Sequence, residues 1–215
     1  TIVRMPFEVR HMGSKYPIFS FDFTGAKRGV LPASYDYLRL EGRMQYRLNL
    51  PPIGYSQLML EGGKIFGKVP YLLLKLHEGN GTYFYDRYAF SCMNFYEFSS
   101  DAWISFFYEH HFNGFLLGRV PLLKKLNWRE VFVFKGVYGT LSARNDGSLP
   151  NTKAVMLFPV GMSSVEHPYL ETGFGIENIF RLLRVDCIWR LTHHRAVPGL
   201  SIPTFTVNFS LNLKF

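Results

Sequence analysis

The stretch TFTVNFSLNLKF, residues 204–215, alternates apolar and polar residues without a break. Because successive side chains of a β-strand point to opposite faces, the stretch predicts a strand with one apolar and one polar surface. The apolar surface comprises Phe205, Val207, Phe209, Leu211, Leu213 and Phe215. Such a strand suits a soluble sandwich, where the apolar face meets a second sheet, or an outer-membrane barrel, where it meets lipid.

The length and the end of this stretch favour the membrane. A strand that crosses a bilayer needs about 9–11 residues, whereas strands of soluble sheets typically have about five or six. The stretch ends on Phe215, and an aromatic residue there resembles the insertion signal of bacterial outer-membrane proteins. We therefore interpret the apolar residues of 205–215 as a membrane-insertion signal. Outer-membrane lipids and the barrel-assembly machinery are the expected partners, and a long edge strand of a soluble sheet is the alternative.

The composition of the chain fits one membrane-embedded β-domain. Its 215 residues include 21 Phe and 13 Tyr, and only 19% are charged. No run approaches about 18 consecutive apolar residues, which excludes a transmembrane helix. The net charge of +8 comes from scattered basic residues without a recognition helix, so nucleic acid is not an expected partner. Residues 1–15 are predicted to be a linker or the end of a preceding element, and residues 16–215 to form the barrel.

The start of the chain carries no signal peptide, although an outer-membrane protein must cross the inner membrane. We therefore expect the chain to be the C-terminal part of a longer protein. Cys92 and Cys187 are too few for a disulfide framework, and a bridge between these two cysteines is left open.

Alternating patterns elsewhere predict about nine strands, including an aromatic-rich one at 83–98, with the longest loop at 144–167. Charged residues that share one strand face cannot enter an apolar core without partners, but they fit the polar interior of a barrel. The predicted interior charge network comprises Arg39, Glu41, Arg43, Arg47, Glu109, His111, Glu171, Glu177, Arg184, Asp186 and Arg190. The expected fold is all-β, an antiparallel transmembrane outer-membrane β-barrel with about 8–10 strands in this chain. It would stand alone with a plugged interior or form part of a larger barrel with a pore.

A weak internal repeat links two basic segments. GKVPYL at 67–72 recurs as GRVPLL at 118–123. Counting strands back from a periplasmic C-terminus places both segments on the periplasmic side, as short amphipathic elements at headgroup level. The basic residues expected at this interface are Lys68, Lys75, Arg119, Lys124 and Lys125. Two unrelated loops that share four residues are the alternative.

Several spaced stretches together resemble one protein family. They are EGNGTY at 78–83, MNFYEF at 93–98, EHHFNG at 109–114 with residues 119–126, and GIENIF at 175–180 with WRLT at 189–192. Together they are similar to a Bacteroidota outer-membrane family known only as a domain of unknown function, usually found behind a carboxypeptidase-regulatory-like domain. The resemblance covers roughly the last two-thirds of the chain. It implies an outer-membrane barrel and a preceding immunoglobulin-like periplasmic domain, but no reaction or substrate.

The candidate catalytic or metal-binding residues are few. Glu109, His111 and Asn113 share one strand face, where the first two could act as an acid/base pair or hold a metal. A metal site normally has a third ligand and supporting hydrogen bonds, so a hydrogen-bonded polar network is the preferred interpretation. No serine spacing indicates a catalytic triad. We therefore predict no catalytic residues, no metal and no cofactor.

The function expected from these patterns is that of a non-enzymatic integral outer-membrane β-barrel. It would act as a scaffold or accessory subunit in envelope assembly or surface-protein handling, together with other outer-membrane or periplasmic subunits. A transport pore or channel is the main alternative. A surface adhesin that binds through residues 144–167 and a hydrolase that uses Glu109 and His111 are further hypotheses.

Overall fold

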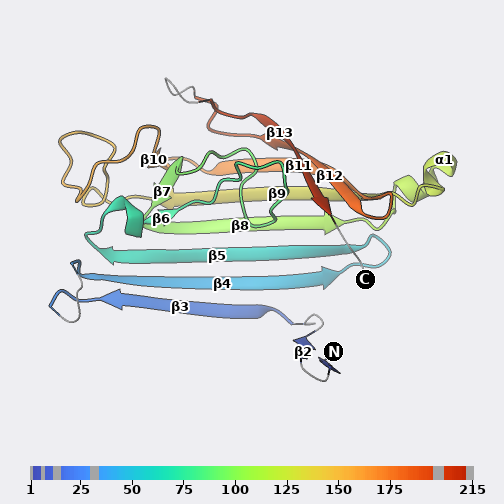
Figure 1. The fold of residues 1–215 in the computed structure, drawn as a ribbon, viewed down its shortest axis with the longest axis horizontal. Helices are drawn as coiled ribbons and strands as arrows, with labels where there is room; N and C mark the ends of the chain where they lie inside the picture. Colours follow the sequence, from blue (N-terminus) through green and yellow to red (C-terminus); the bar gives the residue numbers. More distant parts are fainter. Residues whose placement is uncertain (1, 6–7, 12–15, 30–33, 196–200, 212–215) are drawn as a thin grey trace.

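The computed structural model describes residues 2–5, 8–11, 16–29, 34–195 and 201–211. The protein is all-β and is dominated by one eight-stranded antiparallel sheet (Figure 1). The strand order in this sheet is β13-β12-β11-β9-β8-β5-β4-β3. The strands are β3 (Ile18–Ala26), β4 (Tyr37–Asn49), β5 (Tyr55–Gly67), β8 (Ala102–His111), β9 (Arg129–Thr140), β11 (Tyr169–Ile179), β12 (Leu183–Arg190) and β13 (Phe205–Leu211).

The remaining elements are short. β1 (Ile2–Met5) and β2 (Glu8–His11) form a separate hairpin within the predicted linker 1–15. β6 (Lys75–Leu76), β7 (Phe98–Ser100) and β10 (Ser163–Ser164) form a small second sheet. The short helices are η1 (Tyr71–Leu73), η2 (Leu117–Arg119) and α1 (Pro121–Lys124). Within the described residues, no helix combines the length and the apolar character needed to cross a membrane.

The large sheet is open, so the predicted closure into a barrel is not observed among the described residues. At one edge, β4 is the one described strand that pairs with β3. At the other edge, the backbone of β13 hydrogen-bonds to residues 83–85: Tyr85 N donates to Phe209 O at 2.8 Å and Phe209 N donates to Tyr83 O at 2.7 Å. The all-β antiparallel fold is thus confirmed in its coarse form.

The two faces of the sheet differ as the alternating sequence predicts. Aromatic and aliphatic residues lie on one face, and many of them are solvent-exposed; Phe21 is 70% exposed and Phe174 is 60% exposed. We call this the apolar face. Charged residues lie on the other face, the polar face, where Arg43 is paired in register with Glu61.

Residues 77–97, which we call the inner segment, lie against the polar face (Figure 1). The prediction of a strand at 83–98 is therefore wrong: only Phe98–Ser100 is a strand there, paired within the small sheet. Among its aromatic residues, Phe90 is buried, whereas Tyr83, Phe84, Phe95 and Tyr96 are exposed, so their burial does not alternate from residue to residue. The main buried apolar cluster lies between the inner segment and the sheet, and contains Met59, Phe90, Met93, Phe98, Phe107, Val137, Val165 and Tyr169.

The two segments of the internal repeat lie at opposite ends of the large sheet. Residues 67–72 follow the end of β5, whereas residues 118–123 follow β8, whose last residue His111 pairs with Tyr55 at the start of β5. The expectation that both share one membrane interface is therefore wrong. The predicted topology is wrong here because it included a strand at 83–98. One extra strand inverts the predicted direction of every strand before it.

Candidate functional site

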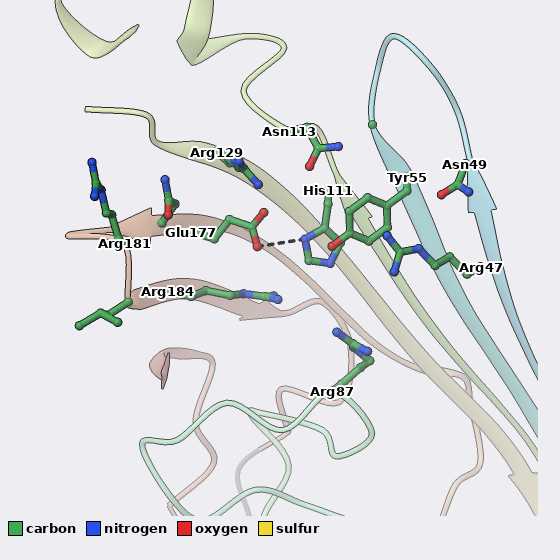
Figure 2. Close-up of a pocket in the computed structure, with 13 residues that line it drawn as sticks. Arg47, Asn49, Tyr55, Arg87, His111, Asn113, Arg129, Glu177, Arg181 and Arg184 are labelled. Atoms are coloured by element: carbon green, nitrogen blue, oxygen red, sulfur yellow. Dashed lines mark hydrogen bonds and ion pairs between the residues drawn. The ribbon is translucent and has the colours of Figure 1, made fainter. Parts of the chain in front are cut away.

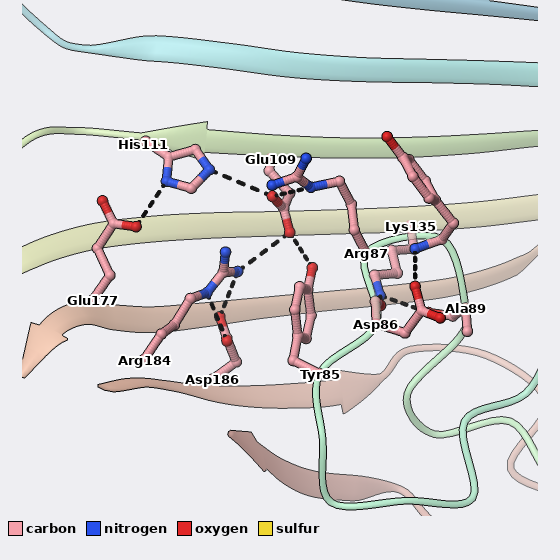
Figure 3. A network of polar contacts seen from close by, with 11 residues as sticks. Tyr85, Asp86, Arg87, Ala89, Glu109, His111, Lys135, Glu177, Arg184 and Asp186 are labelled. Carbon is pink, nitrogen blue, oxygen red and sulfur yellow. Dashed lines mark hydrogen bonds and ion pairs between the residues drawn. The ribbon is translucent and has the colours of Figure 1, made fainter. Parts of the chain in front are cut away.

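The centre of the polar face is Glu109 on β8, whose carboxylate is almost completely buried (Figure 3). Its Oε2 accepts a hydrogen bond from Arg87 Nε at 2.8 Å and lies 3.4 Å from His111 Nε2. Its Oε1 accepts hydrogen bonds from the Tyr85 hydroxyl and, at 3.3 Å, from Arg184 Nη2. Burying a carboxylate without partners costs much free energy, and these contacts offset that cost. Because the partners come from β8, β12 and the inner segment, the Glu109 side chain joins these three parts of the chain.

Arg184 on β12 has a second buried partner on its own strand. Its Nε and Nη2 donate to the Asp186 carboxylate at 2.7 and 2.8 Å, which is a bidentate ion pair. Gly175 lies opposite Asp186 on β11, and a Cβ atom at that position would collide with the carboxylate. The glycine therefore makes room for the ion pair against the sheet.

Two more charged side chains of the sheet hold the backbone of the inner segment. Lys135 Nζ on β9 donates to the carbonyl oxygens of Asp86 and Ala89, at 2.7 and 2.6 Å. The Glu171 carboxylate on β11 accepts from the backbone N–H groups of Ser91 and Cys92, at 2.8 and 2.7 Å. Both side chains are buried, and these bonds satisfy groups that would otherwise lose their water.

Ion pairs also attach both ends of the inner segment. Near its C-terminal end, the buried pair Arg190–Glu97 has an Nη2–Oε1 distance of 2.5 Å. Just before its N-terminal end, Lys75 Nζ donates to Glu61 Oε1 at 2.6 Å, while Arg43 binds the other oxygen of Glu61 at 2.6 Å. The segment is thus fastened to the polar face at both ends and in the middle.

The first residue of the inner segment, His77, is buried and neutral. Its Nε2 lies 2.9 Å from the Ser100 hydroxyl oxygen on β7. Burial, with a smaller contribution from the neighbouring positive charge of Lys75, lowers the pKa of His77 to about 3. The imidazole of His77 is therefore uncharged in the folded protein at neutral pH.

A cavity of about 500 Å³ lies beside the Glu109 cluster, at the end of the polar face formed by the β4–β5 and β11–β12 turns (Figure 2). Its wall contains five arginines, Arg47, Arg87, Arg129, Arg181 and Arg184. The carboxylate in the wall, Glu177, is 3.1 Å from His111 Nδ1. We call this cavity the arginine pocket.

The comparison with known families adds one result. Residues 3–143 match the family of unknown function DUF5686, C-terminal domain. The chain belongs to this family. No curated protein matches it. The match covers the strands from β1 to β9 together with the inner segment, and β11 to β13 follow it. Membership in a family of unknown function agrees with the resemblance seen in the sequence. A Bacteroidota origin, an outer-membrane location and a preceding regulatory-like domain stay predictions.

The structure of this DUF5686 domain brings most of the predicted charge network together. The described ion pairs within the predicted set are Arg39–Glu41, Arg184–Glu109, Arg184–Asp186, His111–Glu109 and His111–Glu177. Arg47 instead stacks on Tyr55, with its guanidinium carbon 4.0 Å from the ring centroid. Arg43, Glu171 and Arg190 bind partners that the sequence did not indicate.

The partners missed from the sequence of this DUF5686 domain fall into two groups. They are Glu61, Lys75, Tyr85, Arg87, Glu97 and Lys135. Four of them lie in or beside the inner segment, whose placement the alternation did not reveal. Glu61 and Lys135 lie on strands, where the polar face of 55–65 and 128–143 could have revealed them.

The predicted interfacial basic residues do not form one set. Lys75 lies on the polar face in its ion pair with Glu61, so its assignment to an interface is wrong. Lys68 and Arg119 lie beyond opposite ends of the sheet, because Lys68 follows β5 and Arg119 follows β8. Lys124 and Lys125 are exposed, at the end of α1.

The predicted insertion signal lies mainly on β13. Four of its residues, Phe205, Val207, Phe209 and Leu211, are on the strand, paired in register with apolar-face residues of β12. Leu213 and Phe215 lie outside the described residues. The two cysteines are free, and burial raises the pKa of the Cys92 thiol to about 12.

One pair with the chemistry of a hydrolase was missed in the sequence of this DUF5686 domain. Ser56 Oγ lies 2.8 Å from His110 Nδ1, and His110 Nε2 lies 3.0 Å from the Ile53 carbonyl oxygen. Both side chains are buried, and Ser56 also contacts the Tyr108 hydroxyl at 3.0 Å. The contacts satisfy polar groups at one end of the apolar face. Within the described residues, no three His, Cys, Asp or Glu side chains gather as metal ligands.

Proposed function

We propose that this protein is a non-enzymatic outer-membrane β-barrel protein, acting as a scaffold or accessory subunit in envelope assembly or surface-protein handling. The observation that carries the proposal is the inner segment bound to the polar face. Glu109, Glu171 and Lys135 contact it from three strands, and each is buried. In a closed barrel, a segment bound in this way would obstruct the path of a solute, which suits a structural role better than a transport role.

The uncovered apolar face supports the membrane part of the proposal. Soluble proteins rarely expose contiguous apolar patches beyond a few hundred Å². Here exposed aromatic residues lie on strands across the sheet, including Phe21 on β3, Phe174 on β11 and Phe205 on β13. Hydrocarbon is a solvent that suits such a face on one side of an antiparallel sheet. Closure into a barrel would require a strand to pair with the edge of β3 that no described strand occupies.

Conductance measurements test the filled interior. The full chain is reconstituted in planar bilayers, and single-channel currents are recorded. We expect no steady conductance, because the ion pairs hold the inner segment in place. Regular single-channel steps from the unmodified chain would contradict the proposal.

Purification from native membranes tests the role as an accessory subunit. The protein is extracted in mild detergent, and the proteins that accompany it in stoichiometric amounts are identified. We expect other envelope proteins to accompany the wild type. A protein that purifies alone under these conditions, with its apolar face intact, would contradict a role as a subunit.

A gated pore is the second candidate, and the distribution of cavities favours it. A cavity of about 330 Å³ beside Arg43 and Asp86 and the arginine pocket lie on the same polar face. A gap of about 20 Å³ beside Arg87 and Tyr88 lies between these two cavities. Movement of the inner segment would join the two cavities into one path.

A disulfide separates the two candidates. Phe84 and Phe209 form an isolated bridge pair, so Phe84→Cys and Phe209→Cys should cross-link in a background without Cys92 and Cys187. A gated pore conducts after reduction and is silent after oxidation. A scaffold is silent in both states.

A further inference from the structure

The arginine pocket holds more positive charge than its neighbours neutralise. Arg87 and Arg184 are paired with the buried Glu109 and Asp186. The guanidinium groups of three other arginines make no hydrogen bond or ion pair with any residue in the described part of the chain. These three are Arg47, Arg129 and Arg181. The carboxylate of Glu177 is engaged with His111.

A cavity lined by charges of one sign focuses the electric field, so arginines gathered around one volume attract anions to it. Scattered surface arginines would each be solvated separately. Here the cationic side chains come from four regions that are well separated in the sequence: β4, the inner segment, β9 and the β11–β12 hairpin. Figure 2 shows Arg87 and Arg184 directed toward the same space from opposite sides. The fold therefore gathers these charges around one volume.

Stacked side chains fix the orientation of one part of the wall of the arginine pocket. The guanidinium carbon of Arg47 lies 4.0 Å from the centroid of the Tyr55 ring. Tyr55 in turn stacks on His111, with centroids 4.5 Å apart and planes 12° apart. A stacked guanidinium keeps its N–H edges free to donate, and its orientation is set before a ligand arrives. The same wall contributes the neutral amides of Asn113 and Asn178.

We propose that the arginine pocket binds an anion that carries two or more phosphate charges. Planar guanidinium groups bind phosphate oxygens with two parallel hydrogen bonds, and several of them around one cavity favour a multiply charged ligand over a single carboxylate. The cavity of about 500 Å³ lies within the usual range of about 300–1,000 Å³ for small-molecule sites. A soluble diphosphate and a phosphorylated lipid headgroup share this chemistry.

Binding is measured by isothermal titration of the full chain in a zwitterionic detergent. One arm uses pyrophosphate, and a second uses a short-chain phosphatidic acid, with the matching phosphatidylcholine as the zwitterionic control. We expect saturable binding in at least one of the first two arms and none with phosphatidylcholine. Binding of pyrophosphate alone identifies a soluble ligand, and binding of the phosphatidic acid alone identifies a lipid headgroup. Absence of saturable binding in both arms overturns the proposal.

Two matched double variants locate the site. Arg129→Gln with Arg181→Gln removes two charges from the pocket, and Lys124→Gln with Lys125→Gln removes two exposed charges from the end of α1. Charge-assisted hydrogen bonds are worth enough that the first variant should bind at least about tenfold more weakly. The second should bind within about twofold of the wild type.

Equal losses in the two variants would overturn the proposal, because they would show attraction to overall charge. Far-UV circular dichroism and the melting temperature report whether the pocket variant folds. Its two arginines make no ion pair with a described residue, so we expect a native fold. If that variant does not fold, Arg47→Gln, on an exposed side chain, provides the same comparison against a single Lys124→Gln variant.

Discussion

Glu109 has four side-chain partners on the polar face, which are Tyr85, Arg87, His111 and Arg184. We predict that Glu109→Gln lowers the free energy of unfolding by about 2–3 kcal/mol, because Arg87 loses its counter-ion and the buried Arg184 keeps only its pair with Asp186. The measurement is guanidinium-induced unfolding in detergent, followed by tryptophan fluorescence.

The control for Glu109 is Glu41→Gln. The Arg39–Glu41 pair is partly exposed, so its loss should cost about 1 kcal/mol or less. Equal costs for the two variants would show that the Glu109 cluster contributes no more than an ordinary surface ion pair.

His77 gives the protein a dependence on pH with a defined direction. Its pKa is about 3 in the folded protein and about 6.5 in the unfolded chain, so the unfolded chain binds the proton first as the pH falls. The contribution of the neutral imidazole is fully present above pH 6.5. It is lost between pH 6.5 and pH 3, at up to about 1.4 kcal/mol per pH unit.

The measurement for His77 is the free energy of unfolding between pH 7 and pH 4, compared with His77→Gln. Carboxylates also titrate in this range and affect both proteins. The test is therefore the difference in the free energy of unfolding between the wild type and His77→Gln. We expect the difference to shrink as the pH falls. A difference that stays constant with pH would contradict the buried neutral imidazole.

The inner segment is the element on which the proposed closed interior depends. Arg87 lies within it and is a potential trypsin site, protected while Lys135 holds the neighbouring carbonyl groups. We predict that Lys135→Met raises the rate of cleavage after Arg87 at least about tenfold, because local opening exposes the site. Lys64→Met, on an exposed lysine of β5, should leave the rate unchanged. Equal protection in Lys135→Met would contradict the fastening role.

The apolar face of β3 offers a test in which lipid and water give opposite results. Phe21 is 70% exposed, so Phe21→Lys in water should change stability by no more than about 0.5 kcal/mol. In lipid, a lysine at mid-membrane depth costs about 2–4 kcal/mol. We predict the larger cost when the protein unfolds from lipid vesicles, and little cost for Ser20→Lys on the other face of the strand.

The strands could be predicted from the sequence because alternation is a local signal. The patterns at 37–48 and 204–215 place the charged residues of β4 and the apolar residues of β13 on the faces where the structure has them. The inner segment could not be predicted in this way. Its aromatic residues are as frequent as in a strand, and its placement depends on Glu171, about 80 positions later in the chain.

The same distinction explains the site. The strand period predicts Glu109, Arg184 and Asp186 on one polar face, where the structure has them. The period does not reveal Arg87 and Tyr85, because their contacts with Glu109 depend on how an irregular segment crosses the sheet. The two basic segments were predicted at one rim because a wrongly predicted strand inverts the direction of the strands before it.

At the scale of the whole molecule, the described residues form an open sheet with one face filled and one face uncovered. The polar face is satisfied internally by ion pairs and the inner segment, whereas the apolar face has no cover among the described residues. The central claim is that hydrocarbon covers this face. If this claim is right, a side chain on the apolar face contacts lipid, whereas a side chain of the same type on the polar face does not.

Two tryptophans allow that claim to be measured directly. Trp189 lies on the apolar face and is 42% exposed, whereas Trp103 lies on the polar face and is 6% exposed. Two single-tryptophan variants, with the other tryptophans replaced by Phe, are reconstituted in vesicles of phospholipids brominated on their acyl chains. The account predicts strong quenching of Trp189 fluorescence and little quenching of Trp103. Equal quenching of the two, or an unquenched Trp189, would contradict it.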